Sequence, residues 1–471
     1  MNEMDNKWIG KNTIRPDGAD KVTGRAEYAA DTIMPGMIWG KVLRSPHPHA
    51  TIKSINTKKA EELDGVFSVA TSADCVDFPV DTPVILGIQD IRWMARNVLA
   101  KEKVLFHGHP IAAVAARTEE IAEKACELIE VDYDVHPWAI EIDDAIKPDA
   151  PILHDFIKFD GKPSNIAGTL EHKKGNIEEG FAKADVVIED DFSTQPVDHA
   201  YLEPMAGISY VDQDGVLTIV SPSQNITHHR HMMAKIMNLP IHKVRFIMSP
   251  VGGGFGGKED MIYQGMLALL AMKTRLPIKY VMSREEDIVS TAKRHPTKTH
   301  YKMGLLKNGK ITAVEIKTLS DGGAYGCSTE GVMRKAAILG AGPYLIENLK
   351  MDTIGVYTNN TPSGAFRSFG ALQTEFATES MIDLASEKLN IDPFEIRRVN
   401  AFKKGDLTHT RPLNNDFSDN PQIVEKPKRT NIKISAGPNL IANFDIKSTI
   451  TIIKDRLISP PIVETITAVP N

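Results

Sequence analysis

A glycine-rich segment, SPVGGGFGGKED (249–260), holds the residues of this sequence that are best suited to meet a ligand. Five of the six positions from Gly252 to Gly257 are glycine, and the sixth is Phe255. A backbone without side chains lets a flat or bulky ligand approach the main-chain N–H groups closely. Because one or two glycines are enough for a tight turn, we interpret the segment as a ligand-binding loop. A strand-to-helix turn capped by acidic residues is the structural alternative.

Two nucleotide-binding patterns also fit this loop in part. Three of its glycines satisfy GxGxxG, between a segment that alternates like a strand (243–251) and one with helical periodicity (259–276). The start of a P-loop fits as well, but Glu259 stands where Ser or Thr would hold Mg²⁺. Glu259 and Asp260 would place two carboxylates in the first turn of the expected helix, where they repel an incoming phosphate. The acidic pair therefore argues against both nucleotide sites.

The elements that must position the loop predict an α+β protein. Residues 10–140 alternate short strands with amphipathic helices, one of them predicted over 118–134. A linker that contains Pro and Asp follows over 141–165, and strands and helices alternate again over 166–410. Residues 411–471 are polar with little periodicity, so we expect an atypical C-terminal tail there.

Composition restricts the possible functions. The chain has 55 Lys and Arg against 61 Asp and Glu, a net charge of −6, which gives no support for nucleic-acid binding. Its three cysteines, Cys75, Cys126 and Cys327, are far apart, so neither an iron–sulfur cluster nor a disulfide framework is expected. No apolar run is long enough for a bilayer and no signal sequence is evident, so we expect no membrane association and a cytoplasmic location.

Several motifs, in order along the chain, resemble the molybdenum hydroxylases, the family of xanthine dehydrogenase and aldehyde oxidase. The glycine loop, PVGGGFGGKE (250–259), resembles the cofactor-binding loop of that family. The resemblance extends over about residues 10–410. The other matching segments are DGADKVTGRAEY (17–28), SPHPHA (45–50), GHPIAAVAA (108–116), HAYLEP (199–204), SQN (223–225), GAFRSFGALQ (364–373) and DPFEIRRVNAFKKGDL (392–407).

The resemblance implies a fold and an activity. It implies an α/β hammerhead domain over 10–140 and the first molybdopterin-binding α+β domain over 166–410. Such subunits bind a molybdopterin-type molybdenum cofactor and oxidise a carbon of an N-heterocycle, purine or nicotinate-like, or of an aldehyde, with oxygen from water. The [2Fe–2S] clusters and FAD of these enzymes would reside in partner subunits, because this chain has neither a cysteine framework nor a credible nucleotide loop.

By the same resemblance, five residues would surround the cofactor. Gln224 would hydrogen-bond an oxygen ligand of molybdenum, and its amide can act as the donor. Phe255, with its neighbours Gly254 and Gly256, would lie beside the metal centre. Arg367 would place a fixed cation near the negative charge of the cofactor. None of them would be a direct protein ligand of molybdenum.

Three further residues are candidates for the substrate side of the site. Glu259 matches an acidic position with which purine-oxidising members hydrogen-bond their substrate, and it could also cap the helix expected after the loop. Phe369 would stack on a planar heteroaromatic ring. Arg334 aligns with a substrate-side arginine only after a one-residue gap. Glu259 and Arg334 together would suit an N-heterocycle with a polar or anionic group.

The catalytic residue of the family is missing from this sequence. In the family, a glutamate in a GxGE-like motif of the second cofactor domain is the general base, which must lie within hydrogen-bond reach of the proton that it takes. The tail holds only Glu425 and Glu464, neither beside a glycine motif. We therefore expect the base in a partner chain, a second-half molybdopterin subunit, and an inactive isolated chain. A truncated or degenerate non-catalytic fragment, or an assembly partner, is the alternative.

Three histidines, His228, His229 and His231, lie close together in the sequence. On a helix the first and third share a face but the second does not, and no nearby carboxylate completes a set of ligands. We expect a polar helix near the cofactor here, and no zinc site.

Overall fold

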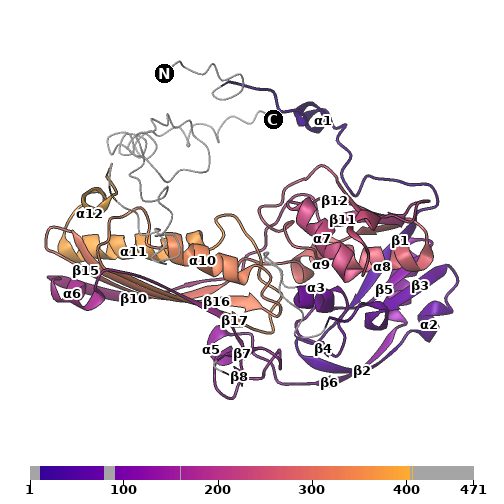
Figure 1. The fold of residues 1–471 in the computed structure, drawn as a ribbon, viewed down its shortest axis with the longest axis horizontal. Helices are drawn as coiled ribbons and strands as arrows, with labels where there is room; N and C mark the ends of the chain where they lie inside the picture. The colour runs from indigo at the N-terminus through magenta and orange to yellow at the C-terminus, as the bar shows by residue number, and fades with distance from the viewer. Residues whose placement is uncertain (1–10, 79–90, 160, 404–405, 407–471) are drawn as a thin grey trace, which may run out of the picture.

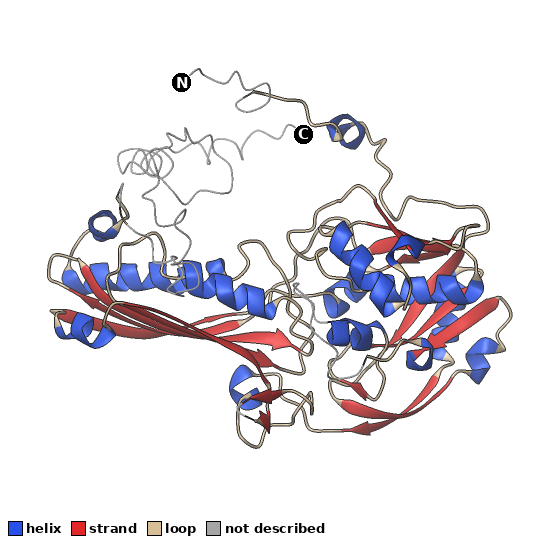
Figure 2. Ribbon diagram, in the orientation of Figure 1, coloured by secondary structure: helices blue, strands red, loops and turns tan. Residues whose placement is uncertain are grey.

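The computed structural model describes residues 11–78, 91–159, 161–403 and 406. Two large sheets, each covered by helices, lie side by side along the long axis of the molecule (Figures 1 and 2). The mixture of helices and strands agrees with the predicted α+β class. Residues 411–471, predicted to form a tail, lie outside the described part of the chain.

A seven-stranded sheet occupies one half of the molecule, in the order β13-β12-β11-β14-β1-β5-β3. Strands of the predicted hammerhead region and of the predicted cofactor region share this sheet, because β1 and β14 pair in parallel through Ile38 and Ile278. The strands are β1 (Ile38–Arg44), β3 (Val66–Thr71), β5 (Pro110–Ala116), β11 (Ala206–Val211), β12 (Leu217–Ser221), β13 (Val244–Met248) and β14 (Ile278–Val281).

Helix α8 (Gln264–Thr274) is the main packing partner of this sheet. Its residues from Gln264 to Ala271 are all buried, which fits a helix that is apolar on every side. It contacts the central strands of the sheet as well as α3. The other helices of this half are α2 (Lys58–Glu61), α3 (Ile91–Val98), α4 (Glu119–Glu127), α7 (Ile226–Ile236) and α9 (Arg284–Ser290), with the 3-10 turns η1 (Ser72–Asp74) and η2 (Ile241–Lys243).

The helix predicted over 118–134 is shorter than expected. It is α4, which begins after Thr118, whose hydroxyl accepts the N–H of Ile121 at 3.3 Å. It ends at Glu127, and strand β6 (Glu130–Val135) follows. The sequence of β6 alternates polar residues with Val131 and Tyr133, the period of a strand, and this local pattern prevails over the helical one.

A small sheet and a connecting region lie beneath the two large sheets in Figure 1. The three-stranded sheet has the order β4-β2-β6, and a two-stranded ribbon pairs β7 with β8. Helix α5 lies in the stretch predicted as a linker, where Ile142 and Ala145 pack with Val356 of the neighbouring sheet. The elements are β2 (Ala50–Asn56), β4 (Lys103–Val104), α5 (Ile142–Ala145), β7 (Lys158–Phe159) and β8 (Lys162–Pro163).

The other half is built on a five-stranded sheet with the order β10-β15-β16-β17-β9. Helices α10 (Thr329–Leu339) and α11 (Ala371–Leu389) run along one face of it (Figure 1). The core between them contains Tyr301, Met351 and Met381. The remaining elements are β9 (Ile166–Lys174), β10 (Val186–Thr194), β15 (Thr297–Leu305), β16 (Ile311–Gly323), β17 (Leu349–Tyr357), α6 (Ile177–Ala182) and α12 (Pro393–Asn400).

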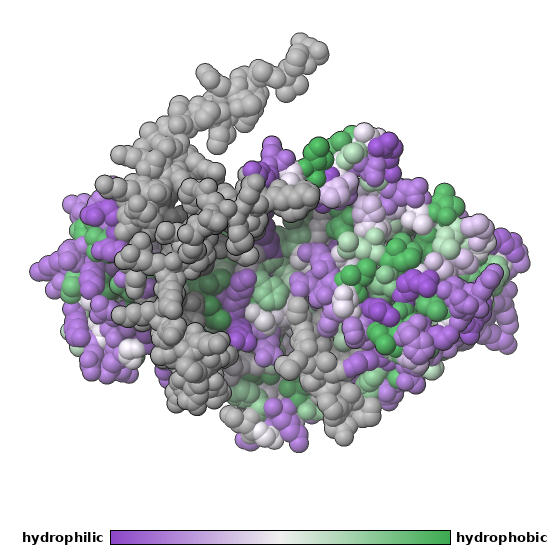
Figure 3. All heavy atoms as spheres, turned by 45° about the horizontal axis from the view of Figure 1, so that its top comes forward, coloured by the Kyte–Doolittle hydropathy of each residue, from purple (hydrophilic) through white to green (hydrophobic). Residues whose placement is uncertain are grey.

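Helix α1 (Gly18–Val22) has no buried residue and stands away from both halves (Figure 1). The face turned forward in Figure 3 carries apolar patches between hydrophilic side chains over the half with the seven-stranded sheet. None of the helices in the described part of the chain is both long and apolar enough to cross a membrane.

Candidate functional site

The glycine loop connects β13, the edge strand of the seven-stranded sheet, to the buried helix α8. The helix begins at Gln264 and not at Glu259 as the periodicity predicted. The prediction that Glu259 and Asp260 cap its first turn is therefore wrong. The physical reason is that the chain turns inward after the loop and buries Lys258 and Asp260 before the helix starts.

The glycines of the loop are required by contacts within the chain itself. A Cβ at Gly252 would lie 2.6 Å from the Cβ of Glu203, and a Cβ at Gly256 would overlap the carbonyl oxygen of Ala365. Gly256 also has a φ of +111°, which L side chains rarely adopt. Packing therefore explains these glycines without a ligand, and only the groups that the loop leaves unpaired are available to one.

Glu203 fastens both ends of the loop. Its Oε2 accepts the N–H of Gly252 at 2.7 Å and the ammonium of Lys258 at 2.6 Å. The Lys258 side chain is fully buried and lies 4.6 Å from the centre of the Tyr201 ring. Burial lowers the pKa of Lys258, while Glu203 acts in the opposite direction. Sequence reasoning missed this pair, although each partner stands inside a matched motif.

Gln224 fastens the middle of the loop. Its Oε1 accepts the N–H of Gly256 at 2.9 Å and that of Lys258 at 3.2 Å, and its backbone N–H donates to the Lys258 carbonyl at 2.8 Å. Two N–H donors at one amide atom require that atom to be the oxygen. No described residue accepts a hydrogen bond from Nε2, so the donor end of the exposed Gln224 amide is the end available to a ligand.

The loop presents a run of free donors next to an exposed ring. In the described part of the chain, the N–H groups of Gly253, Gly254 and Phe255 have no hydrogen-bond acceptor. Phe255 has a φ of +53°, and 49% of the residue is exposed. Its carbonyl accepts the N–H of Arg367 at 2.8 Å, which ties the loop to the segment 364–370. Three amides and the Gln224 amide together fit a ligand rich in acceptor atoms.

The segment that carries Arg367 has an uncommon backbone. Ser368, Phe369 and Gly370 have φ values of +79°, +49° and +100° in succession, and the first two lie in a region that is costly for residues with a side chain and is concentrated at functional sites. The Arg367 side chain is exposed. The Phe369 ring packs against Gly331 of α10, where an added Cβ would lie 3.0 Å from its Cε1.

The three substrate-side candidates lie on different segments. Arg334 is exposed on α10, three residues after Gly331, so it shares a helix face with the contact of Phe369. Glu259 lies in the loop, and burial raises the pKa of its carboxyl. No hydrogen bond or ion pair among the described residues joins Glu259 to Arg334 or to Phe369. By contrast, hydrogen bonds join the cofactor candidates: Gln224 to Gly256, and Phe255 to Arg367.

His229, on the helix expected to lie near the cofactor, is buried and makes contacts that the sequence does not predict. It is buried, and its Nε2–H donates to the Glu259 carbonyl at 2.7 Å, so Nδ1 accepts from the Ser223 hydroxyl at 3.0 Å. Burial lowers the pKa of His229 to about 4, so the ring is neutral at physiological pH. It links the segment of Gln224 to the end of the glycine loop. Among the described residues, no group of three His, Cys, Asp or Glu is placed to hold a metal ion.

A second carboxyl lies behind the loop. Asp260 is buried, and burial together with the neighbouring Glu259 raises its pKa to about 8. It packs so closely on the segment 364–370 that a Cβ at Gly364 would overlap its Oδ2. The protonated form of Asp260 therefore predominates at neutral pH.

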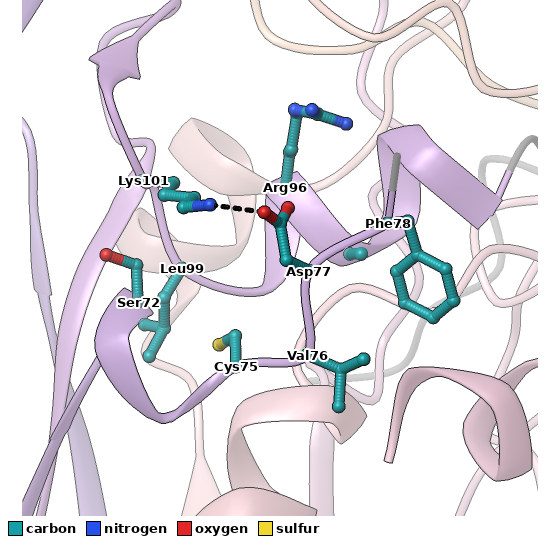
Figure 4. A pocket seen from close by; sticks show the side chains of 9 residues that line it. Ser72, Cys75, Val76, Asp77, Phe78, Arg96, Leu99 and Lys101 are labelled. Atoms are coloured by element: carbon teal, nitrogen blue, oxygen red, sulfur yellow. Dashed lines mark hydrogen bonds and ion pairs between the residues drawn. The ribbon is translucent and has the colours of Figure 1, made fainter. Parts of the chain in front are cut away.

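A pocket in the hammerhead region is separate from this arrangement (Figure 4). Asp77 and Lys101 form an ion pair of 2.7 Å beside it. None of its lining residues belongs to the glycine loop or to the segments that pack on the loop. They are Ser72, Cys75, Val76, Asp77, Phe78, Ala95, Arg96, Leu99 and Lys101.

Comparison with known proteins identifies the family. Residues 158–401 match the molybdopterin cofactor-binding domain, and residues 23–137 match the a/b hammerhead domain of aldehyde oxidase and xanthine dehydrogenase. A probable xanthine dehydrogenase subunit of Bacillus subtilis (strain 168) is 40% identical over 394 residues, 84% of this chain and 51% of that protein. The nicotinate dehydrogenase large molybdopterin subunit of Eubacterium barkeri is 36% identical over 397 residues, 84% of this chain and 90% of that protein.

Solved structures agree with these matches. The aldehyde oxidoreductase of Desulfovibrio gigas superposes with a TM-score of 0.76 at 32% identity, over 84% of this chain and 44% of that one. Quinoline 2-oxidoreductase of Pseudomonas putida 86 gives 0.75 at 27% identity, over 84% and 50%. With the exception of the nicotinate dehydrogenase subunit, the chain spans about half the length of the relatives named here. The predicted hammerhead and molybdopterin-binding folds are confirmed, and the chain belongs to the xanthine dehydrogenase and aldehyde oxidase family of molybdenum hydroxylases, as a molybdopterin-binding subunit.

Proposed function

We propose that this chain forms one wall of a molybdenum cofactor site and works as an oxidoreductase only within a multi-subunit complex. One observation carries the proposal. Gln224, the glycine loop and Arg367 belong to three distant motifs, yet hydrogen bonds to the backbone fasten all three to one another. The groups that this network leaves free are donors and a cation, and they all suit an anionic ligand rich in acceptors.

The residues have distinct parts in this proposal. The Nε2 of Gln224 would donate to an oxygen of the bound cofactor, and Gly254, Phe255 and Gly256 would line its site. The free N–H groups of the loop bind acceptor atoms of the cofactor, and Arg367 balances its negative charge. A bound cofactor supplies the transfer of oxygen from water to a substrate carbon and takes up the electrons. The chain itself binds, orients and excludes water.

We propose an N-heterocycle, purine or nicotinate-like, as the substrate, with an aldehyde as the alternative. The carboxyl of Glu259 has no cationic partner among the described residues, so it is available to a polar group of a heterocycle. The Phe369 ring, supported by Gly331, offers a stacking surface, and Arg334 would meet an anionic substituent. The names of two relatives, a probable xanthine dehydrogenase subunit and a nicotinate dehydrogenase subunit, support this substrate class.

We infer that partner subunits complete the enzyme. A second-half molybdopterin subunit would carry the general base, and other subunits would carry the [2Fe–2S] clusters and FAD. The relatives support a divided subunit. The match covers 90% of the nicotinate dehydrogenase large molybdopterin subunit, a chain of similar extent, whereas it covers 51% of the Bacillus protein, which is about twice as long as the match.

Co-expression with the chains encoded beside this one tests the proposal. The purified complex should contain molybdenum and pterin and should oxidise a purine or a pyridine carboxylate with an added electron acceptor. A complex without metal or pterin would refute it. An adjacent reading frame that begins with the second cofactor domain supports the divided enzyme. A GxGE motif found only in another frame of the same gene supports a truncated, non-catalytic fragment.

A further inference from the structure

Arg294 lies in the connection between α9 and β15 and contacts the turn that carries Arg367 and Phe369. The residue is 8% exposed. Its Cζ lies 3.8 Å from the centre of the Phe366 ring, close enough for a strong cation–π contact. The same ring stacks on His199, with 4.1 Å between centroids and 17° between planes.

The guanidinium of Arg294 reaches both ends of the turn. Its Nη2 donates to the carbonyl of Arg367 at 3.1 Å, and its Nη1 approaches the Oε1 of Gln373, in the first turn of α11, at 3.4 Å. Three consecutive residues with positive φ lie between these two contacts. A conformation of this cost persists only where the surroundings over-determine it. The contacts of Arg294 with Arg367 and Gln373 hold the turn at both of its ends.

The two neighbours of Arg294 fasten the other segments of the site. Lys293 pairs with Asp198 at 2.8 Å, next to the segment that holds the glycine loop. The Nε2 of His295 lies 2.8 Å from the Oγ1 of Thr329, at the start of α10. Three successive side chains thus reach the segment that leads to Glu203, the turn that carries Arg367 and the start of α10, the helix of Arg334.

The charge of Arg294 has no carboxylate within ion-pair distance among the described residues. Burial without a counter-ion is unfavourable, and it lowers the pKa of this guanidinium. A buried lysine would carry the same charge on one compact ammonium without a planar face, whereas the planar fork of arginine can stack on a ring and donate in two fixed directions at once. The planar shape of the guanidinium, and not only its charge, therefore fits its contacts with the Phe366 ring, Arg367 and Gln373.

We propose that Arg294 is a positioning residue that sets the turn from Arg367 to Gly370 and thereby orients Arg367 and Phe369 in the active site. This inference rests on the proposed function for its consequence in catalysis. Its structural part, the ordering of the turn, stands on the contacts of Arg294 alone.

The test compares Arg294→Lys and Arg294→Gln in the full complex. Hydrogen exchange of the amides in 365–372 should rise roughly tenfold in both variants, since each loses one or two hydrogen bonds. KM for the heterocycle should rise about tenfold, with a smaller change in kcat, because Phe369 would contact bound substrate. Phe366→Leu, which removes the ring and keeps every charge, should give the same pattern and is the second route where an Arg294 variant does not fold.

Arg397→Lys is the matched control. Arg397 also donates as a fork, to Glu379 and Asp383, but it lies on α12. This change should leave exchange in 365–372 and KM as in the wild type. Restoration of exchange and KM by lysine at 294, or unchanged exchange in all three variants, would overturn the proposal. A wild-type complex without molybdenum would refute the proposed function instead, and the exchange measurement would still decide whether Arg294 orders the turn.

Discussion

The carboxylate of Glu203 and the ammonium of Lys258, 2.6 Å apart and buried, close the glycine loop into a ring. The same Glu203 oxygen also accepts the N–H of Gly252. Two residues six positions apart in the loop are therefore fixed to a single atom. These two hydrogen bonds to one buried oxygen hold the loop in its shape.

Replacing Glu203 with Gln should destabilise the protein strongly. The change leaves the ammonium of Lys258 buried without its counter-charge, and breaking a buried pair in this way costs about 3–5 kcal/mol. Urea unfolding of the full chain measures the loss. Asp77→Asn is the control, because its pair with Lys101 is exposed and contributes about 0–1 kcal/mol. Equal effects of the two changes would show that the Glu203 pair does not hold the loop.

Replacing Gln224 with Glu separates the two ends of its amide. A carboxylate oxygen can still accept the N–H groups of Gly256 and Lys258, but the Nε2 donor is lost. Because one positioned donor typically contributes a factor of about 10²–10³ to a rate, turnover per molybdenum should fall by roughly that factor. Metal content and activity are measured on the same preparation of the complex. An unchanged rate per metal would remove Gln224 from the proposed site.

Replacing Glu259 with Gln tests the substrate side. A hydrogen bond to a charged group contributes about 1.5–3 kcal/mol, so kcat/KM for a purine or pyridine substrate should fall roughly 10- to 150-fold. The raised pKa of Glu259 adds a pH test: where the ionised carboxylate binds substrate, kcat/KM falls with decreasing pH at a higher pH than for an ordinary glutamate. The substitution keeps the hydrogen bond from His229 to the backbone carbonyl of residue 259. An unchanged kcat/KM would therefore show that the Glu259 side chain does not contact the substrate.

The motifs identified the family, the hammerhead and the cofactor-binding fold correctly, because their residues are local strings that are visible in one sequence. The contacts that position the site were not visible in this way. Glu203 and Lys258 are 55 positions apart, and His229 meets Glu259 across two segments. No periodicity reports such pairings, because they arise only when tertiary packing brings the segments together.

Local patterns also failed where burial prevailed over them. The helical periodicity of 259–276 included residues that the fold uses as an inward turn, so α8 starts at Gln264. The many glycines predict close approach of a ligand, whereas Gly252 and Gly256 are required by contacts with Glu203 and Ala365. A signal was nevertheless present, since Glu203 and Lys258, of opposite charge, each stand inside a matched motif.

Replacing Asp260 with Asn should change how stability depends on pH. The pKa of Asp260 is raised from 3.8 to about 8, so the folded state holds its proton over a range in which the unfolded state has lost it. The stabilisation that this proton provides is complete below about pH 4 and is lost as pH rises through about 8. Asparagine does not titrate, so the free energy of unfolding of the variant, relative to the wild type, should increase steadily between about pH 5 and pH 8. Urea titrations at about pH 5, 6.5 and 8 measure this difference; a constant difference would mean that Asp260 is ionised in the folded protein, and that the close packing of Gly364 accommodates a charge.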